Sequence, residues 1–444
     1  MLIAFFYCTT TLIAAAASYK AAVVEFKTDS NHLSPQYMQN NLIGFEKVLK
    51  RIRSEGGAQI VVFPENAILG VDLERTRKSI YPYLEVIPTP QSTKILPCNN
   101  IEYSDRPILT KLSCFARNYN VVLVANMGEV QPCSGSFVDC PKDGHFQFNT
   151  NVVFENNGRL IAKYQKQHLY DIENNIFDPG SQIYSSIAFN TSFGVTFGTL
   201  TCLDILHKEP GSNLVSILNV KNFILPLAWG NNFPFHMSLV VEQSWSLKHQ
   251  VNLLAANLQY SHESLKGHSK LAYYSSGSGI YSSGHAINYY ISDNLSSAMG
   301  DIIIAEVPED PESSNTENDN GKILYPGNIK SRTSTYLTYR FLEHSNGVIE
   351  VTHKYLEKNS ITCRLEYSIQ IHGLLERYAL GAFIGVKPRD QSFGYAVCVI
   401  VKCRTSNIQD CGSPIEGYSS NTLFILVGHF QMTPKYMLVR LVVD

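Results

Sequence analysis

Short apolar runs of strand length recur through the first two thirds of the chain, and segments with helical periodicity separate them. The runs "QIVVFPE", "VVLVANMGEV" and "FGTLTC" lack the polar alternation of a strand with one solvated face. Such continuous runs are typical of strands buried on both faces. Between "AAVVEF" and "QIVVFPE", five apolar residues share one helical face: Met38, Leu42, Phe45, Leu49 and Ile52. This alternation predicts an α/β fold in which helices cover the outer faces of a sheet.

The character of the sequence changes around Glu309. The stretch "EDPESSNTENDNGK" is polar and predicts a linker or an exposed loop. Later segments such as "YALGAFIGV" and "YAVCVIVKC" are β-rich and carry few helical signals. We therefore expect a first domain over residues 19–308 and a smaller, β-rich C-terminal domain over residues 309–444.

The N-terminal stretch "MLIAFFYCTTTLIAAAASYK" has features of a secretory signal peptide. An apolar core precedes small residues that suit cleavage, although the usual basic region is missing. A buried N-terminal strand is the alternative. No later run reaches the ~18 apolar residues that a membrane span needs. We expect residues 1–18 to be a signal peptide and the mature protein to be soluble and secreted, with candidate glycosylation at Asn190 ("NTS") and Asn294 ("NLS").

The charge of the chain disfavours two classes of partner. Lys and Arg number 36 and Asp and Glu number 38, so the formal net charge is −2, and no long run of one sign occurs. This balance provides no electrostatic attraction for nucleic acid or for an anionic membrane surface. A small, neutral molecule is the ligand that we expect.

The cysteine count indicates one free thiol. The chain has ten cysteines, and nine remain once Cys8 leaves with the signal peptide. In an oxidising compartment an odd count implies a free thiol or an intermolecular bridge. Cys202 is the candidate for the free thiol, because it lies in an apolar, strand-like context and the others flank loop residues. We expect Cys133 and Cys140 to pair locally; the sequence leaves the remaining pairings open.

Three polar residues stand at the ends of predicted strands: Glu65 after "VVFP", Lys166 after "IAKYQ" and Cys202 after "FGTLT". Each alone has an ordinary explanation as a loop, surface or core residue. Together they supply the parts of a nucleophilic amide hydrolase. Cys202 would attack, Lys166 would stabilise the thiolate and then the oxyanion, and Glu65 would carry the proton to the leaving amine.

These residues lie in stretches that resemble the nitrilase (carbon–nitrogen hydrolase) superfamily, and within it the vanin and biotinidase branch. The matching stretches include "VVFPENAILG", "LSCFARNYNVVLVANMGE", "CPKDGHFQFNTNVVFENNGRLIAKYQKQHLY", "TCLDILHKEP" and "VKCRTSNIQDCG". The resemblance spans nearly all of the expected mature chain. It implies a nitrilase-like α-β-β-α sandwich followed by a β-rich domain.

The resemblance also implies roles for individual residues. Glu65 would be the general base, Lys166 the oxyanion stabiliser and Cys202 the nucleophile. Glu173 stands where the superfamily often places a second glutamate that orients the lysine, with a surface residue as the alternative. Asp204 is similar to a structural carboxylate behind the nucleophile, with a solvated role as the alternative.

The reaction that this resemblance implies is hydrolysis of the linear amide of pantetheine to pantothenate and cysteamine through a thioester, without a cofactor. Hydrolysis of biotin amides is the alternative within the branch, because the shape of the acyl pocket is not evident. Trp229, in "LAWGNNFPF", would line or support that pocket or belong to the plain core.

Two other interpretations have less support. A catalytically silent binding protein on the same scaffold would be favoured by loss of Glu65, Lys166 or Cys202, and all three are present. A metal site would need clustered ligands, and the histidines are scattered along the chain.

The sequence ends in "YMLVRLVVD", which lacks the long hydrophobic tail of a GPI signal, so we expect no such anchor on the chain as given. The oligomeric state is left open.

Overall fold

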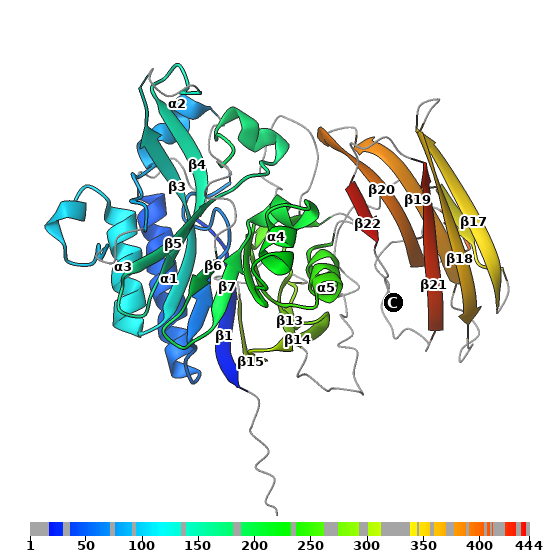
Figure 1. Ribbon diagram of the computed structural model, residues 1–444, viewed down its shortest axis with the longest axis horizontal. Coiled ribbons are helices and arrows are strands. Elements are labelled where there is room, and N and C mark those ends of the chain that lie inside the picture. The colour runs from blue at the N-terminus through cyan, green and yellow to red at the C-terminus, as the bar shows by residue number, and fades with distance from the viewer. Residues whose placement is uncertain are drawn as a thin grey trace, which may run out of the picture.

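The computed structural model describes most of the chain (Figure 1). The described residues are 17–29, 36–71, 76–90, 95–134, 139–180, 188–231, 237–261, 274–292, 301–311, 338–343, 346–355, 359–369, 377–387, 390–403, 406–408, 411, 422–431 and 437–440. Residues 1–16 of the expected signal peptide, the sequon at Asn294 and most of the expected linker lie outside the described residues. The signal peptide and the domain limits therefore stay predictions.

The first large sheet is mixed. β1 pairs with β2 and β2 with β3 in parallel, whereas the other neighbours are antiparallel. Its strands in spatial order are β15 (Asp301–Pro308), β1 (Ser18–Glu25), β2 (Ile60–Val62), β3 (Val122–Pro132), β4 (His145–Phe154) and β5 (Leu160–Gln165).

The second large sheet repeats this plan, with a parallel centre where β8 lies between β10 and β7. Its strands in spatial order are β14 (His285–Tyr290), β13 (Ser278–Ser282), β10 (Asn252–Asn257), β8 (Asn222–Leu227), β7 (Thr196–Thr199) and β6 (Ala188–Asn190).

The two sheets pack face to face, and helices cover their outer faces. The layer between the sheets is apolar and includes Val23 and Val124 from the first sheet and Ile224 and Leu254 from the second. Helices α1 (Tyr37–Ser54) and α3 (Pro107–Tyr119) pack on the first sheet. Helices α4 (Gly211–Ser216) and α5 (Ser238–His249) cover the second. The α-β-β-α sandwich is thus confirmed.

The helix predicted after the first strand is α1. Leu42, Phe45, Leu49 and Ile52 all lie in the core beneath it. The chain leaves the helix through Gly56, whose φ of 96° falls in the region that favours glycine. Burying this apolar face is what holds the helix on the sheet, since most helical stability in proteins comes from such packing.

Short elements connect the layers. In the described residues they include α2 (Arg77–Ile80) and the 3₁₀ helices η1 (Tyr81–Tyr83), η2 (Ile101–Tyr103), η3 (Asp171–Asn175) and η5 (Cys202–Leu206). A small sheet contains β11 (Tyr260–Ser261), β12 (Tyr274–Ser275) and β9 (Gly230–Asn231).

The C-terminal region is β-rich, as expected, and its strands form a β-sandwich. One sheet contains β16 (Thr338–Phe341), β19 (Arg377–Lys387), β20 (Asp390–Cys403) and β22 (Met437–Arg440); the other contains β17 (Asn346–Tyr355), β18 (Asn359–Ile369) and β21 (Thr422–Gln431). An apolar core lies between them. Figure 1 shows this sandwich on the α5 side of the molecule, where Leu239 packs in one cluster with Phe383 and Val399.

Four disulfides join described cysteines. Cys133–Cys140 confirms the expected local pair, and the other pairs are Cys98–Cys114, Cys363–Cys398 and Cys403–Cys411. Cys363 lies on β18 and Cys398 on β20, so their bridge joins the two sheets of the C-terminal sandwich. Cys202 is the one free cysteine among the described residues, as predicted. No helix in the described ranges is long and apolar enough to cross a membrane.

Candidate functional site

Glu65, Lys166 and Cys202 come from the ends of strands in both large sheets. Glu65 stands just beyond β2, and Lys166 directly follows β5 of the same sheet. Cys202 comes after β7 of the second sheet. Because the sheets are packed face to face, these strand ends meet, and residues more than one hundred positions apart become neighbours.

Lys166 lies between two carboxylates. Its Nζ donates to Glu65 Oε1 at 2.7 Å and to Glu173 Oε2 at 2.6 Å. The exposed fraction of the Lys166 side chain is 1%. A buried charge is stable only when it is paired and hydrogen-bonded, and this pairing meets that condition. The structure therefore brings Glu173 against Lys166, and its role in orienting the lysine stays a prediction.

Backbone and side-chain donors hold both carboxylates. Glu65 Oε2 accepts from the backbone amide of Ala228 at 3.0 Å. The side-chain amide of Asn149 donates to Glu65 Oε1 and to Glu173 Oε1, both at 2.8 Å. Glu173 Oε2 also accepts from the backbone amide of Tyr170 at 2.8 Å. Each carboxylate is thus oriented by groups other than Lys166.

The apolar context of Cys202 predicted that this residue ends a strand. That prediction is wrong. β7 ends at Thr199, and Cys202 is the first residue of the 3₁₀ helix η5, with a φ of 46°. A left-handed backbone is uncommon for a residue other than glycine, and such residues cluster at functional sites. The sharp turn here separates the side chain of Cys202 from the regular pattern of the strand.

The electrostatic setting of the site keeps the sulfur protonated in the free protein. Burial raises the pKa of the Cys202 thiol well above its usual value, and the Glu65 carboxylate adds to the rise. The Lys166 ammonium and a hydrogen bond from the Ala228 amide lower that pKa without offsetting the rise. A group that accepts the thiol proton is therefore needed before the sulfur can act as a nucleophile.

The two partners of Cys202 have shifted pKa values as well. Burial alone would lower the pKa of Lys166, but Glu173, Glu65 and Cys202 outweigh burial and raise it well above its usual value. Burial raises the pKa of Glu65, and Lys166 opposes this rise. Lys166 is therefore a permanent cation at neutral pH, and Glu65 holds a proton more readily than a solvated glutamate does.

Asp204 stands two residues after Cys202 and is fully buried, so the solvated role is wrong; its role as a structural carboxylate stays a prediction. Its Oδ2 accepts from the backbone amide of Thr201 at 3.0 Å and from the Tyr164 hydroxyl at 2.8 Å. Its Oδ1 accepts from the backbone amide of His168 at 3.0 Å and contacts the Nδ1 of that residue at 2.8 Å. Asp204 therefore ties the turn that carries Cys202 to β5 and to the segment after Lys166.

Trp229 belongs to the apolar cluster that contains Cys202, and its side chain is buried. Its backbone amide donates to Asn257 Oδ1 at 2.8 Å, which holds the segment that also presents Ala228. This buried position fits a side chain that supports an acyl pocket, and it equally fits an ordinary residue of the hydrophobic core. The role of Trp229 in a pocket stays a prediction.

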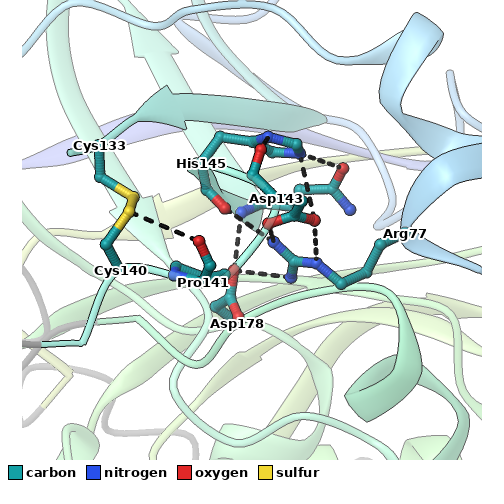
Figure 2. Close-up of a disulfide and its surroundings, with 8 residues drawn as sticks. Arg77, Cys133, Cys140, Pro141, Asp143, His145 and Asp178 are labelled. Carbon is teal, nitrogen blue, oxygen red and sulfur yellow. Dashed lines mark hydrogen bonds and ion pairs between the residues drawn. A yellow bond between two sulfur atoms is a disulfide. The ribbon is translucent and has the colours of Figure 1, made fainter. Parts of the chain in front are cut away.

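A charged cluster holds the segment that carries Glu173. Arg77 Nη1 donates to Asp178 Oδ2 at 2.8 Å, and the same oxygen accepts from the backbone amide of Gln147 at 2.8 Å. Arg77 Nε also donates to Asp143 Oδ2 at 2.8 Å. Figure 2 shows Arg77 between the two aspartates, close to the disulfide that closes the loop after β3. Through Arg77, the cluster joins Asp143, just before β4, to Asp178, just after η3.

Asn149 and the backbone amide of Ala228 are the groups at the site that the sequence did not predict. A signal for Asn149 exists in "QFNTNVVF", where Gln147, Asn149 and Asn151 alternate along a strand. Alternate residues point to one face, so a row of amides on a buried strand indicates a polar network. A backbone amide such as that of Ala228 leaves no trace in a sequence.

The remaining candidates have simple outcomes. Asn190 lies at the end of β6 with an exposed side chain, and Asn294 is outside the described residues. The rings of His168 and His207 stack with centroids 3.6 Å apart. Within the described ranges, no three His, Cys, Asp or Glu side chains are grouped as a metal site requires.

Comparisons with known proteins agree with this architecture. Residues 20–211 match the carbon–nitrogen hydrolase family, and residues 328–442 match the vanin C-terminal domain. Pantetheinase of Homo sapiens is 33% identical over 389 residues, covering 85% of this chain and 71% of that protein. Biotinidase of Takifugu rubripes is 34% identical over 427 residues, covering 90% and 80%.

A solved structure is also similar. It is a Saccharomyces cerevisiae member of branch 10 of the nitrilase superfamily, with 21% identity and a TM-score of 0.49, covering 67% of this chain and 92% of that one. On the sequence matches, the chain belongs to the carbon–nitrogen hydrolase family, in its vanin and biotinidase branch, and is a hydrolase of carbon–nitrogen bonds other than peptide bonds.

Proposed function

We propose that this protein hydrolyses the linear amide of pantetheine to pantothenate and cysteamine, with Cys202 as nucleophile, Lys166 as oxyanion stabiliser and Glu65 as general base and acid. The observation that carries the proposal is the buried Glu65–Lys166–Glu173 cluster next to the free thiol. The similarity to the human protein named pantetheinase supports the choice of substrate.

Charge balance favours Glu65 as the base. With both carboxylates ionised, the cluster of one ammonium and two carboxylates carries one excess negative charge. Losing the Cys202 proton to solvent would add a second negative charge in a buried place, which is costly. Passing that proton to Glu65 leaves the total charge unchanged. The same transfer activates the sulfur as it approaches the substrate carbonyl.

Among the described residues, Lys166 Nζ donates to two acceptors, which leaves one donor for the transition state. An ammonium has three N–H groups, and two of them donate to Glu65 and Glu173. The third can donate to the substrate carbonyl oxygen as it becomes an oxyanion. Such a fixed charge in a water-poor site is among the strongest contributions to catalysis.

The reaction then closes in two steps. Glu65 gives its proton to the departing amine nitrogen as the carbon–nitrogen bond breaks, and the acyl group remains on Cys202 as a thioester. Water next attacks the thioester carbon and yields its proton to Glu65. The carbon–sulfur bond then breaks, the acid leaves, and Glu65 returns that proton to the Cys202 sulfur. The net change is one amide and one water converted to one carboxylic acid and one amine.

Biotin amides are the second candidate substrate. The similarity to the Takifugu rubripes protein named biotinidase extends over more of this chain than the similarity to the human pantetheinase does. The proposed chemistry is the same for both substrates, because each is a linear amide and they differ only in the acyl group and the amine that the amide joins. The acyl pocket would then decide between them.

Secretion is part of the proposal. The four disulfides support an oxidising compartment, and the N-terminal stretch has the features of a signal peptide. Asn190 is exposed and would accept a glycan there.

The test is to incubate the purified protein with pantetheine and with biocytin, alongside Cys202→Ser as the matched control. Release of cysteamine from pantetheine, lost in the variant, is the expected result. Release of lysine from biocytin, without release of cysteamine from pantetheine, would indicate that the substrates are biotin amides and not pantetheine. Turnover that persists in Cys202→Ser would remove the proposed nucleophile. No turnover of either amide by the folded protein would contradict the substrate assignment.

A further inference from the structure

Three buried asparagines form a hydrogen-bonded group beside the candidate site. Asn126 lies on β3, and Asn149 and Asn151 lie on β4. Asn126 Nδ2 donates to Asn149 Oδ1 at 2.6 Å and to Asn151 Oδ1 at 3.0 Å. Their exposed fractions are 2%, 1% and 0%. We call this group the asparagine relay, and the mechanism above does not use it.

One backbone amide determines how all three side chains are oriented. Asn126 Oδ1 accepts from the backbone amide of Asn66 at 2.9 Å, and a backbone N–H can only donate. The Nδ2 end of Asn126 must therefore face Asn149 and Asn151, and both must present an oxygen to it. Their own Nδ2 groups then point away from Asn126.

The outward-pointing amide of Asn149 reaches the proposed catalytic cluster. Its two N–H groups go to Glu65 Oε1 and Glu173 Oε1, each at 2.8 Å. A reversed amide would place an oxygen against two carboxylates instead. The backbone amide of Asn66 thus fixes the orientation of Asn126. Asn126 in turn directs the Nδ2 group of Asn149 toward Glu65.

The outward-pointing amide of Asn151 reaches the strand that leads to the nucleophile. Its Nδ2 donates to Thr199 Oγ1 at 3.0 Å and to the carbonyl oxygen of Leu200 at 3.1 Å. Cys202 is two residues further along the chain. The relay therefore connects the turn that carries Glu65 with the turn that carries Cys202, across both sheets.

We propose that Asn149 is a positioning residue, oriented by Asn126, which holds the Glu65 and Glu173 carboxylates on either side of Lys166 and keeps Glu65 able to accept the Cys202 proton. This inference rests on the proposed function of Glu65 as the base. A hydrogen bond to a carboxylate favours its charged form and lowers its pKa. Loss of the Asn149 donor should therefore raise the pKa of Glu65.

The test compares Asn149→Leu with Asn126→Leu and with a control, Asn252→Leu. Leucine has nearly the shape of asparagine and no donor. Asn252 is also fully buried, and its Nδ2 donates to Asn222 Oδ1 at 2.7 Å, within the second sheet. The control therefore reports the cost of losing a buried amide outside the relay. Near-ultraviolet circular dichroism identifies the variants that fold.

The readout is the rate at which iodoacetamide alkylates Cys202 as a function of pH. This assay needs no amide substrate, so it remains readable if pantetheine is not cleaved. The pH at which alkylation reaches half its maximum should rise by about one unit in Asn149→Leu. Asn126→Leu should shift it in the same direction, and Asn252→Leu should leave it unchanged.

Two results would overturn the proposal. One is a folded Asn149→Leu or Asn126→Leu protein with the wild-type midpoint. The other is a midpoint shift in Asn252→Leu as large as that in the relay variants. If Asn149→Leu does not fold, Asn126→Leu decides, because Asn126 does not contact either carboxylate.

Discussion

Replacing Glu173 by glutamine should move the pH dependence of this protein to lower pH. The carboxylate of Glu173 raises the pKa values of Glu65 and Cys202 by charge repulsion. Both Glu65 Oε1 and Glu173 Oε2 lie within 2.7 Å of Lys166 Nζ, so they are at most about 5 Å apart. At an effective dielectric constant of about 20, that repulsion is about 3 kcal/mol.

Such an energy corresponds to about two pKa units, and the counter-charge on Lys166 makes this an upper value. The acid limb of the pH profile should therefore move down by about one to two units in Glu173→Gln. The plateau rate should also fall by about ten- to one hundred-fold, because Lys166 exchanges a carboxylate partner for a neutral amide and a hydrogen bond between charged groups is worth about 1.5–3 kcal/mol. This downward shift is opposite to the shift expected for Asn149→Leu.

The assay is kcat/KM for amide hydrolysis across the pH range, with Cys202 alkylation as the substrate-free readout. Glu129→Gln is the matched control, because Glu129 pairs with the buried Lys163 at 2.5 Å in the same sheet. We expect the control to lose stability and to keep the wild-type pH profile. An unchanged or upward-shifted acid limb in Glu173→Gln would refute the electrostatic reasoning.

Four further predictions concern the reaction and the fold. Glu65→Gln and Lys166→Ala should each lower turnover by about one hundred-fold or more without unfolding the protein; near-normal turnover, measured by release of cysteamine, would remove that residue from the mechanism. Burial raises the pKa of Glu25 to about 8 in the folded protein, whereas an unfolded chain releases the proton at its usual lower pH. The wild type should lose stability as the pH rises toward 8, and Glu25→Gln should not; parallel Tm curves for the two proteins would contradict this. Replacing both Cys363 and Cys398 by alanine should lower the free energy of unfolding by about 2–4 kcal/mol, because the bridge joins two sheets; urea unfolding with an unchanged midpoint would speak against that role.

The sequence alone predicted the features that depend on burial and on local spacing. Alternating apolar runs and helical faces indicated the layered α/β architecture, because a strand or helix must bury its apolar side chains wherever it lies in the fold. The odd cysteine count indicated that Cys202 is free, and the short separation of Cys133 and Cys140 indicated their pairing. Glu65, Lys166 and Cys202 were visible after predicted strands for the same local reason, although Cys202 begins the 3₁₀ helix η5 and does not end β7.

Tertiary structure decided which of those strand ends meet. The contact between Lys166 and Glu173 spans seven residues, but Asn149 meets Glu65 across 84 positions and Ala228 meets it across 163. Such contacts depend on the order of strands within two sheets and on the packing of one sheet against the other, which no local pattern records. The left-handed backbone at Cys202 has the same origin, because it lies in the turn after β7, where the sulfur comes near Glu65 and Lys166. Sequence periodicity records whether a side chain is buried, and only the folded chain determines what it is buried against.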